Sequence, residues 1–530
     1  MVFRYVLVAT LSLFVIELNA LNDICKNANG TVDKLPVRKK NILFLVADDM
    51  RPNLGVYGNV NKRFFRAPYM RTPNLDKLAR KSMLFNNAFC QQALCVPSRT
   101  SFLTGRRPDT TRVVGWTYWR QSGGNFTTIP QFFKENGYRT IAGGKLFHLN
   151  VPNIRDDRKF SWTEGNHHSY RRHDPFHNVW KAFTPPELSK VPLEDTLEAT
   201  YIINKLKQVA KDKTKPFFVA FGARKPHMPF NFPSKYIHYY PSNKVGLPYN
   251  YYTPSNMPNI AWNDPPIFHY KGCKPKTKFW NWKRKYRLRL GKVKEVRRAY
   301  YAAISFVDNE MGRVLNALRT LGLEKNTIVV FLSDHGWQLG EHAQWAKQTN
   351  FDIANRVPLM IRVPGVTDKG VRTNMLTELV DIFPTLVEAA GFERLKTCPA
   401  NSKWRKLCTE GSSLFPHLRG TAKGIFREST NSNNTIETKS AENTKWKSAD
   451  EKNDAKWKDA VFWQYPKGHK KYGIVPRSMG YTIRTWRFRY TEWVYIRHLG
   501  GKLYRPYWNR PRDRPELYDL SRDPQENINR

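Results

Sequence analysis

Two apolar runs, each followed directly by acidic residues, constrain the fold of this chain more than any other feature of its sequence. Asn41–Ala47 and Asn326–Leu332 consist almost entirely of apolar side chains, and they lead into Asp48-Asp49 and Ser333-Asp334. Runs of this kind are typical of strands that are buried on both faces of a parallel sheet. The sequence therefore predicts a sheet whose strand ends bring carboxylates together.

Strand and helix patterns alternate along the rest of the first 390 residues. We expect further strands at 138–143 and 216–222, and helices at 72–80, 194–211, 296–321 and 378–390. This alternation predicts an α/β fold with a doubly wound, mostly parallel sheet. In such folds, ligands bind beyond the carboxyl ends of the strands.

The pattern changes towards the C-terminus. Residues 425–458 are polar and lysine-rich, which favours a linker or a surface loop, and 459–530 contains short β-rich segments that predict a smaller antiparallel sheet packed on the main domain. The expected organisation is a signal peptide at 1–20, an N-terminal segment at 21–35, a catalytic domain at 36–424, the lysine-rich segment and a C-terminal subdomain.

The charge balance indicates a polyanionic partner. The chain has 88 Lys and Arg against 44 Asp and Glu, which gives a formal net charge of +44. Such a field attracts nucleic acid, anionic membranes or sulfated polysaccharides. A hydrophobic content of 40% excludes global disorder, and a mean hydropathy of −0.62 excludes a polytopic membrane protein.

The first residues indicate export. Arg4 precedes an apolar run at 5–16 that ends near Ala20, as in a secretory signal. The run is shorter than the roughly 20 residues that a transmembrane helix needs, so we expect no transmembrane anchor. Candidate glycosylation sites fit an exported protein, and export argues against nucleic acid as the partner. These sites are Asn29, Asn125 and Asn433.

Six cysteines in a chain of this length do not form a disulfide scaffold. Cys398 and Cys408 close a short loop and are the candidate disulfide. The sequence leaves the pairing of three others open, namely Cys25, Cys90 and Cys273.

The acidic residues after the two apolar runs form a candidate metal site. Asp48, Asp49 and Asp334 would repel one another at one edge of the sheet unless a cation neutralised them, and oxygen ligands suit Ca²⁺ or Mg²⁺. The alternative is that each Asp caps the helix or turn that follows it.

The segment around Cys95 decides between these readings. Cys95 precedes Pro97, which opens a helix and places the sulfur at the end where anions bind. The residues Cys95-Val-Pro97-Ser-Arg99, followed by Leu103-Thr-Gly-Arg106, resemble the signature of the formylglycine-dependent sulfatases, within the alkaline-phosphatase-like superfamily.

Further motifs extend the resemblance over roughly residues 40–392. They follow the family order and are Ala-Asp-Asp at 47–49, Thr-Pro-Asn-Leu-Asp at 72–76, Gly-Lys-Leu-Phe-His at 144–148, Lys-Pro-His-Met-Pro at 225–229 and Ser-Asp-His-Gly-Trp at 333–337. The segments 103–111 and 339–352 resemble the branch of the family that acts on iduronate 2-sulfate.

The resemblance implies an exo-acting sulfatase that removes the 2-O-sulfate of iduronate in heparan or dermatan sulfate. In the family, a formylglycine-generating enzyme oxidises the Cys at this position in the endoplasmic reticulum. The hydrated aldehyde then attacks sulfur with one hydroxyl and releases sulfate with the second. The implied location is the secretory pathway, ending in the lysosome or outside the cell.

The resemblance also implies a role for each site residue. One Ca²⁺ would be held by Asp48, Asp49, Asp334, His335 and the modified Cys95. Arg99 and Lys145 would hold the diol and the sulfate charge, and His148 would be the base. His227 and Lys347 would act on the sulfate and the leaving oxygen, with His227 as general acid, and Trp337 either lines the sugar pocket or is a core aromatic.

Alternatives remain open at this point. A sulfatase of this fold could act on another sulfated sugar, and a secreted, non-catalytic heparan-sulfate binder could share the fold. A related metal phosphoesterase is disfavoured, because it would need Ser or Thr in place of Cys95. The basic segment 271–298, which includes Lys283–Arg289, is either a track for a sulfated chain or a solvated helix face.

Overall fold

The computed structural model describes residues 39–58, 66–122, 124–148, 157–169, 178–263, 266–273, 288–400, 405–422, 457–469, 475–499 and 504–530. The compact unit considered below is Lys40–Arg530. Several predictions lie outside the described residues. These are the signal peptide, Cys25, Asn29, Asn433, residues 283–287 of the basic segment and nearly all of the lysine-rich segment.

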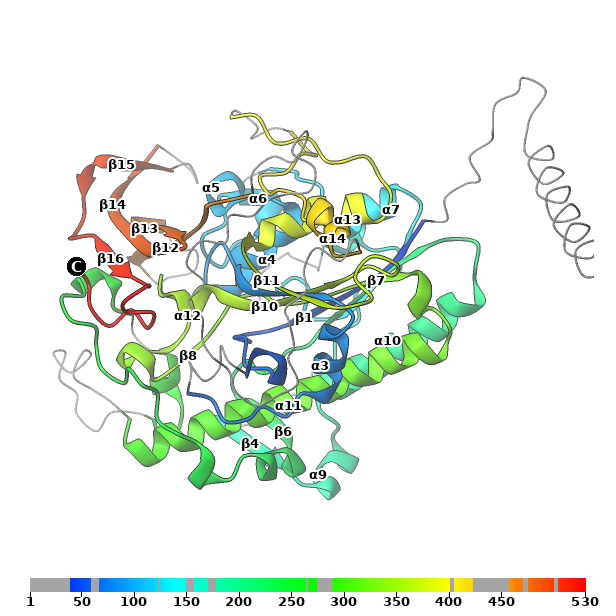
Figure 1. Ribbon diagram of the computed structural model, residues 1–530, viewed down its shortest axis with the longest axis horizontal. Coiled ribbons are helices and arrows are strands. Elements are labelled where there is room, and N and C mark those ends of the chain that lie inside the picture. Colours follow the sequence, from blue (N-terminus) through cyan, green and yellow to red (C-terminus); the bar gives the residue numbers. More distant parts are fainter. Residues whose placement is uncertain are drawn as a thin grey trace, which may run out of the picture. The chain divides into compact units, whose positions relative to one another are not determined.

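A seven-stranded sheet forms the centre of the unit (Figure 1), in the order β11-β2-β10-β7-β1-β5-β3. The strands are β1 (Asn41–Ala47), β2 (Met83–Phe89), β3 (Arg139–Gly144), β5 (Phe217–Gly222), β7 (Thr327–Ser333), β10 (Arg356–Arg362) and β11 (Val371–Glu378). All neighbouring pairs are parallel except those of β10, which is antiparallel to both β7 and β2. The predicted mostly parallel α/β sheet is confirmed.

Helices cover both faces of this sheet, as Figure 1 shows. On one face lie α4 (Cys95–Thr104), α7 (Ile129–Glu135), α13 (Ile382–Ala389) and α14 (Phe415–Ala422), and on the other lie α3 (Pro73–Ala79), α10 (Glu194–Lys211) and α11 (Leu290–Thr320). Alternate residues of β1 enter the two cores, because successive side chains of a strand point to opposite faces. Phe44 packs with α4 and α7, whereas Leu43 and Leu45 pack on the side of α11.

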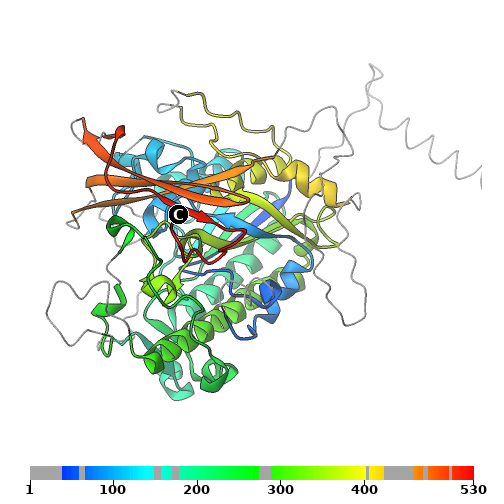
Figure 2. The same cartoon turned by 60° about the vertical axis from the view of Figure 1, so that its left-hand side comes forward.

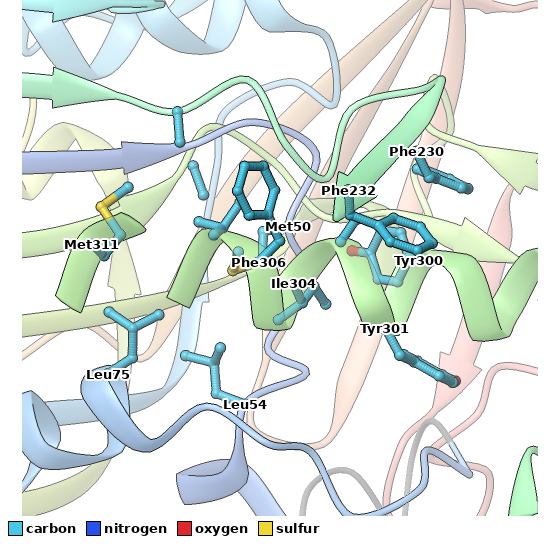
Figure 3. Packing of buried hydrophobic residues seen from close by; sticks show 14 of the residues in the cluster. Met50, Leu54, Leu75, Phe230, Phe232, Tyr300, Tyr301, Ile304, Phe306 and Met311 are labelled. Carbon is cyan, nitrogen blue, oxygen red and sulfur yellow. The ribbon is translucent and has the colours of Figure 1, made fainter. Parts of the chain in front are cut away.

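The long helix α11 packs against one face of the sheet. Its buried side chains include Ile304 and Met311, on the side of Leu54 and Leu75, and Tyr300, which lies beside Phe230 (Figure 3). The helix also holds the start of α3, since the carboxylate of Asp308 accepts hydrogen bonds from the backbone N–H groups of Asn74 (3.3 Å) and Leu75 (2.8 Å). The chain leaving β1 is therefore fixed against α11.

Shorter elements complete the unit. They are α5 (Pro108–Thr111), α6 (Trp119–Ser122), α8 (Arg158–Ser161), α9 (Pro185–Lys190), α12 (Asp352–Asn355), β4 (Trp180–Phe183), β6 (Phe230–Pro233), β8 (Gln338–Leu339) and β9 (Trp345–Ala346). In the part of the chain that the structure describes, no helix combines the length and the apolar character needed to cross a bilayer.

A second, antiparallel sheet is formed near the C-terminus by β12 (Ala460–His469), β13 (Val475–Thr485), β14 (Phe488–His498), β15 (Tyr504–Pro511) and β16 (Glu516–Asp519). Figure 2 shows its long strands from the side. One face packs on the main domain through Met479, Ile496 and Tyr504, which contact Val114. The predicted small antiparallel sheet is confirmed.

Two helix boundaries differ from the predictions. The segment predicted as a helix from residue 378 continues β11 through Glu378, which pairs with Phe89, and α13 begins at Ile382 after a 3₁₀ turn. The helix predicted from residue 296 already begins at Leu290. Both differences reflect pairing and packing partners that lie far away in the sequence.

Candidate active site

The carboxyl ends of four parallel strands deliver the predicted site residues to one edge of the sheet. β1 ends at Asp48-Asp49, β7 at Asp334-His335 and β3 at Lys145, while His227 follows β5. Cys95 comes from the next layer, at the first position of α4, all of whose residues are buried. The helix end predicted for Cys95 is therefore confirmed.

The Cys95 sulfur lies at the centre of the cluster and is 0% exposed. It is 3.0 Å from Nζ of Lys347, 3.6 Å from Nζ of Lys145 and 3.5 Å from Nε2 of His335. Oδ1 of Asp48 is 3.6 Å away. A group at this position is thus surrounded by cations, carboxylates and an imidazole in a site without bulk water.

Each of the three carboxylates has a cationic partner. Lys145 pairs with Asp48 and Lys347 pairs with Asp49. Arg99 pairs with Asp334 through Nε at 3.0 Å, and its Nη1 donates to the carbonyl oxygens of Lys145 and Leu146. Because Arg99 is fixed on both sides, it holds the end of β3 against the start of α4.

Two groups of ligand atoms in the cluster could hold a metal ion. One consists of Asp48, Cys95, Asp334 and His335, and the other of Asp49, Cys95 and His227, with the atoms of each group lying within 4.8 Å of one another. The buried Oδ2 of Asp49 has no hydrogen-bond partner among the described residues. Three converging carboxylates and one unpartnered oxygen form a donor set suited to a hard cation.

The pKa values of the carboxylates diverge because their surroundings differ. Burial tends to raise the pKa of Asp48, but Lys145, His227 and Arg99 outweigh it and hold that pKa well below its ordinary value. Burial raises the pKa of Asp49 to about 7, against the opposing effect of Lys347. An added cation beside Asp49 would favour its ionised form.

Burial also raises the pKa of the Cys95 thiol to about 12, and Lys145 and Lys347 offset this only in part. An unmodified thiol at this position is therefore protonated at neutral pH and is a weak nucleophile.

The histidines of the site are held as neutral imidazoles. Burial, and then Lys145, lowers the pKa of His148, whose Nδ1 has no hydrogen-bond partner among the described residues. Burial likewise lowers the pKa of His227, against the effect of Asp48. A neutral His148 fits the role of a base, whereas His227 would act as an acid only with added negative charge beside it.

Lys347 and Trp337 lie together at the site. Nζ of Lys347 is 5.5 Å from the centre of the Trp337 ring, which is 2% exposed and belongs to the core on the α11 side of the sheet. Most of the indole therefore belongs to the hydrophobic core. Its contact with a sugar stays a prediction.

The cysteines and the remaining sequon are placed as follows. The Cys398–Cys408 disulfide is present. Among the described residues, Cys90, Cys95 and Cys273 are free and buried. The side chain of Asn125 lies at the surface, where it accepts a hydrogen bond from Arg120.

Sequence reasoning missed the residues that fix the Asp49 turn. The hydroxyl of Tyr300 accepts a hydrogen bond from the N–H of Arg51 (3.0 Å) and donates one to the carbonyl oxygen of Asp49 (2.8 Å). Asp49 itself has a φ of 64°, in the left-handed region. Tyr300 lies inside α11, far from any motif, and only the folded structure brings it to the site.

A buried ion-pair triad also escaped prediction. Oε1 of Glu341 lies 2.9 Å from Nη1 of Arg51 and 2.9 Å from Nη1 of Arg297, and all three side chains are at most 1% exposed. The triad fixes the residues that directly follow the Asp48-Asp49 turn. Two arginines and a glutamate scattered over 290 positions give no signal in the sequence.

Comparisons with known proteins agree with this geometry. The family model described as Sulfatase matches residues 40–392. Iduronate 2-sulfatase of Mus musculus is 37% identical over 500 residues, which cover 86% of this chain and 84% of the relative. Iduronate 2-sulfatase of Homo sapiens is 35% identical over 519 residues, with coverages of 88% and 86%.

A solved structure shares the fold. It is a protein in complex with its substrate D-glucosamine-2-N,6-O-disulfate, and it aligns with a TM-score of 0.59 at 20% identity, covering 93% of each chain.

Proposed function

The chain belongs to the sulfatase family and is a sulfuric ester hydrolase, and on this premise we propose that it removes the 2-O-sulfate of iduronate from heparan or dermatan sulfate. The observation that carries the proposal is the position of Cys95, enclosed by two lysines and three carboxylates at the strand ends. The two mammalian relatives support the choice of sugar.

We propose that Cys95 is converted to formylglycine by a formylglycine-generating enzyme and that one Ca²⁺ binds beside it. The ligands would be Asp48, Asp49, Asp334, His335 and the modified residue 95. The donor set fits, since three buried carboxylates converge and the Oδ2 of Asp49 lacks a hydrogen-bond partner among the described residues. The modified residue supplies a hydroxyl nucleophile, and the cation supplies positive charge for the sulfate oxygens.

The side chains of the chain itself would bind and orient the ester. Lys145 and Lys347 lie at the sulfur position from two sides, where they can pair with sulfate oxygens. Arg99 holds the backbone of Lys145 and so fixes the site before substrate arrives.

Proton transfer would be carried out by His148 and His227. The Nδ1 of His148 is unpartnered among the described residues and can accept the proton of the nucleophile. Burial lowers the pKa of His148, so the imidazole is a stronger base only when negative charge lies beside it. His227 has its Nδ1 at the carbonyl oxygen of Met228, which leaves Nε2 facing the carboxylate of Asp49. A sulfate group bound nearby adds negative charge, which favours the imidazolium that a general acid needs.

The proposed location is the secretory pathway, with the lysosome or the extracellular space as destination. An exposed Asn125 within its sequon supports glycosylation during export, and the Cys398–Cys408 disulfide fits an oxidising compartment. Asn29 and Asn433 are proposed as further glycosylation sites on their sequons alone.

Replacing Cys95 tests the mechanism. The tryptic peptide that contains residue 95 should be lighter by the exchange of H₂S for oxygen, should react with carbonyl reagents and should resist thiol alkylation. Cys95→Ala should fold and lose all turnover, whereas Cys95→Ser should at most accumulate a sulfate ester on the enzyme. An alkylatable Cys95 in a preparation that still releases sulfate would refute this mechanism.

A panel of defined disaccharides tests the substrate. Release of sulfate from non-reducing-end iduronate 2-sulfate, and not from glucosamine 6-sulfate or glucosamine N-sulfate, is the expected result. Turnover of only the glucosamine esters would keep the sulfatase activity and overturn the choice of sugar.

A further inference from the structure

The outward face of the C-terminal sheet carries a group of arginines and tyrosines. In the register of β14 and β15, Arg497 lies directly opposite Arg505, and Tyr495 directly opposite Tyr507. The alternate residues Ile496 and Tyr504 are buried against the main domain. Arg497, Arg505 and Tyr507 are exposed, so the two pairs lie at the protein surface at this end of the sheet.

Two more arginines join this face from the end of β15. The guanidinium carbons of Arg510 and Arg512 lie 5.0 Å and 4.9 Å from the centre of the Tyr495 ring, and Nη1 of Arg512 donates to the Tyr495 hydroxyl at 2.8 Å. Arg497 lies 5.9 Å from the centre of the Tyr507 ring. We call Arg497, Arg505, Arg510 and Arg512, with the two tyrosines, the arginine face.

No carboxylate in the described part of the chain balances the charge of the arginine face. All four arginines are exposed, and among the described residues none of them has a carboxylate within ion-pair distance. Arg489, on the same face of β14 but nearer its start, is by contrast buried and paired with Glu516 and Glu526. Since like charges directly opposite each other destabilise a sheet, the Arg497–Arg505 pair needs an external anion to become favourable.

The geometry favours anions spaced along a flexible chain. Guanidinium groups bind sulfate oxygens in a bidentate manner, and here they are ordered in advance by the tyrosine rings. Single-stranded nucleic acid would instead need free aromatic faces for its bases, but guanidiniums already lie against both tyrosine rings.

We propose that the arginine face binds a linear sulfated polysaccharide at a place separate from the candidate active site. The choice of polysaccharide rests on the proposed function, whereas the anion-binding surface follows from the arrangement of the arginines. The surface would hold a long chain on the protein beyond the single sugar that is cleaved.

A charge-matched pair of variants tests this surface. The face variant is R497Q/R505Q/R510Q/R512Q. The control variant is K207Q/K211Q/K213Q/K215Q, which removes the same number of charges from exposed lysines at and after the end of α10. Binding of both to size-defined heparin chains is measured at several salt concentrations.

We expect the face variant to bind heparin about tenfold or more weakly. Its affinity should also depend less on salt: the slope of log affinity against log salt should fall in magnitude by up to about four, one for each lost anion contact. The control variant should change affinity by less than about twofold. Equal losses in both variants would show that only net charge matters and would overturn the proposal. Unchanged affinity in the face variant would overturn it as well.

Further measurements separate the possible partners. A poly-dT strand or phosphatidylserine vesicles bound as tightly as heparin, and lost equally in the face variant, would overturn the choice of a polysaccharide. Arg505→Gln alone removes the like-charge pair, so it should keep the thermal midpoint of the protein and still weaken heparin binding. This single variant serves if the fourfold variant does not fold.

Turnover measurements separate this inference from the proposed function. The face variant should keep the wild-type kcat and KM on a sulfated disaccharide and show a raised KM only on long chains. Cys95→Ala should lose turnover and keep heparin affinity. A wild-type protein without any desulfation activity would refute the proposed function. The binding measurements on heparin would still decide whether the arginine face binds a sulfated polysaccharide.

Discussion

Replacing Glu341 by Gln should destabilise the whole fold, because the buried carboxylate of Glu341 pairs with both Arg51 and Arg297. Its Oε2 also accepts a hydrogen bond from the N–H of Leu339 at 2.6 Å. Gln has nearly the same shape as Glu, so packing is kept and the negative charge is removed. Two buried guanidinium groups then lose their counter-charge.

The magnitude follows from the pKa of Glu341. Burial tends to raise this pKa, but Arg51 and Arg297 outweigh it and lower it from 4.5 to about 2. A pKa lowered to this extent corresponds to about 3 kcal/mol in favour of the folded state. Breaking a buried ion pair on one side typically costs about 3–5 kcal/mol, which is of the same size.

The sign of the pH dependence can be worked out from the same shift. The folded-state pKa is depressed, so the stabilisation is fully present above the unfolded-state pKa near 4.5 and is lost as the pH falls towards about 2. We therefore expect Glu341→Gln to lower the free energy of unfolding by about 3 kcal/mol at pH 7, with a smaller difference from wild type at pH 3.

Urea denaturation at the two pH values measures this difference. Glu324→Gln is a suitable control, since Glu324 also contacts two cations, Lys81 and Arg362, but is 24% exposed. The control should change stability by less than about 1 kcal/mol. A loss below 1 kcal/mol in Glu341→Gln at pH 7, or an equal loss at both pH values, would contradict the reasoning.

Two further predictions concern the metal cluster. Asp48→Asn and Asp334→Asn should each abolish Ca²⁺ binding in calorimetry and sulfate release, with an unchanged circular dichroism spectrum, and full activity at unchanged metal content would disprove the assigned site. Tyr300→Phe leaves two buried backbone groups without their partner, so it should lower the free energy of unfolding by about 1–3 kcal/mol and weaken Ca²⁺ binding. Tyr301→Phe is its control, because the Tyr301 hydroxyl has no hydrogen-bond partner among the described residues, and equal effects of the two changes would refute the positioning role of Tyr300.

Local patterns in the sequence predicted four strands of the large sheet that are buried on both faces, whereas β2 and β10 were not predicted although they are also almost fully buried. β1, β3, β5 and β7 lie within one residue of the predicted bounds because their apolar runs are nearly continuous. β11 was not predicted, since Val371–Glu378 mixes polar and apolar residues and three of its first four residues are not buried. Its place in the sheet depends on pairing with β2, which is distant in the sequence.

The residues of the candidate site were predictable where a sequence motif directly follows a recognisable strand or begins a helix. The Asp residues follow apolar strands and Cys95 starts a helix, so the carboxyl-edge rule already placed them together. The supporting contacts of Tyr300 and Glu341 were not predictable, because they connect α11 and the loop after β8 to the Asp49 turn. Such contacts depend on packing between layers and produce no periodic pattern in the sequence.

The complete burial of Cys95 determines when this residue can be modified relative to folding. Residue 95 is 0% exposed and begins a helix whose ten residues are all buried. A modifying enzyme has to surround its peptide, and the folded chain offers no accessible stretch here. Any conversion of Cys95 must therefore precede the packing of α4, so the active fraction would be set by competition between modification and folding. Slower folding during export would raise the yield of active molecules, and a chain that folded first would stay permanently inactive.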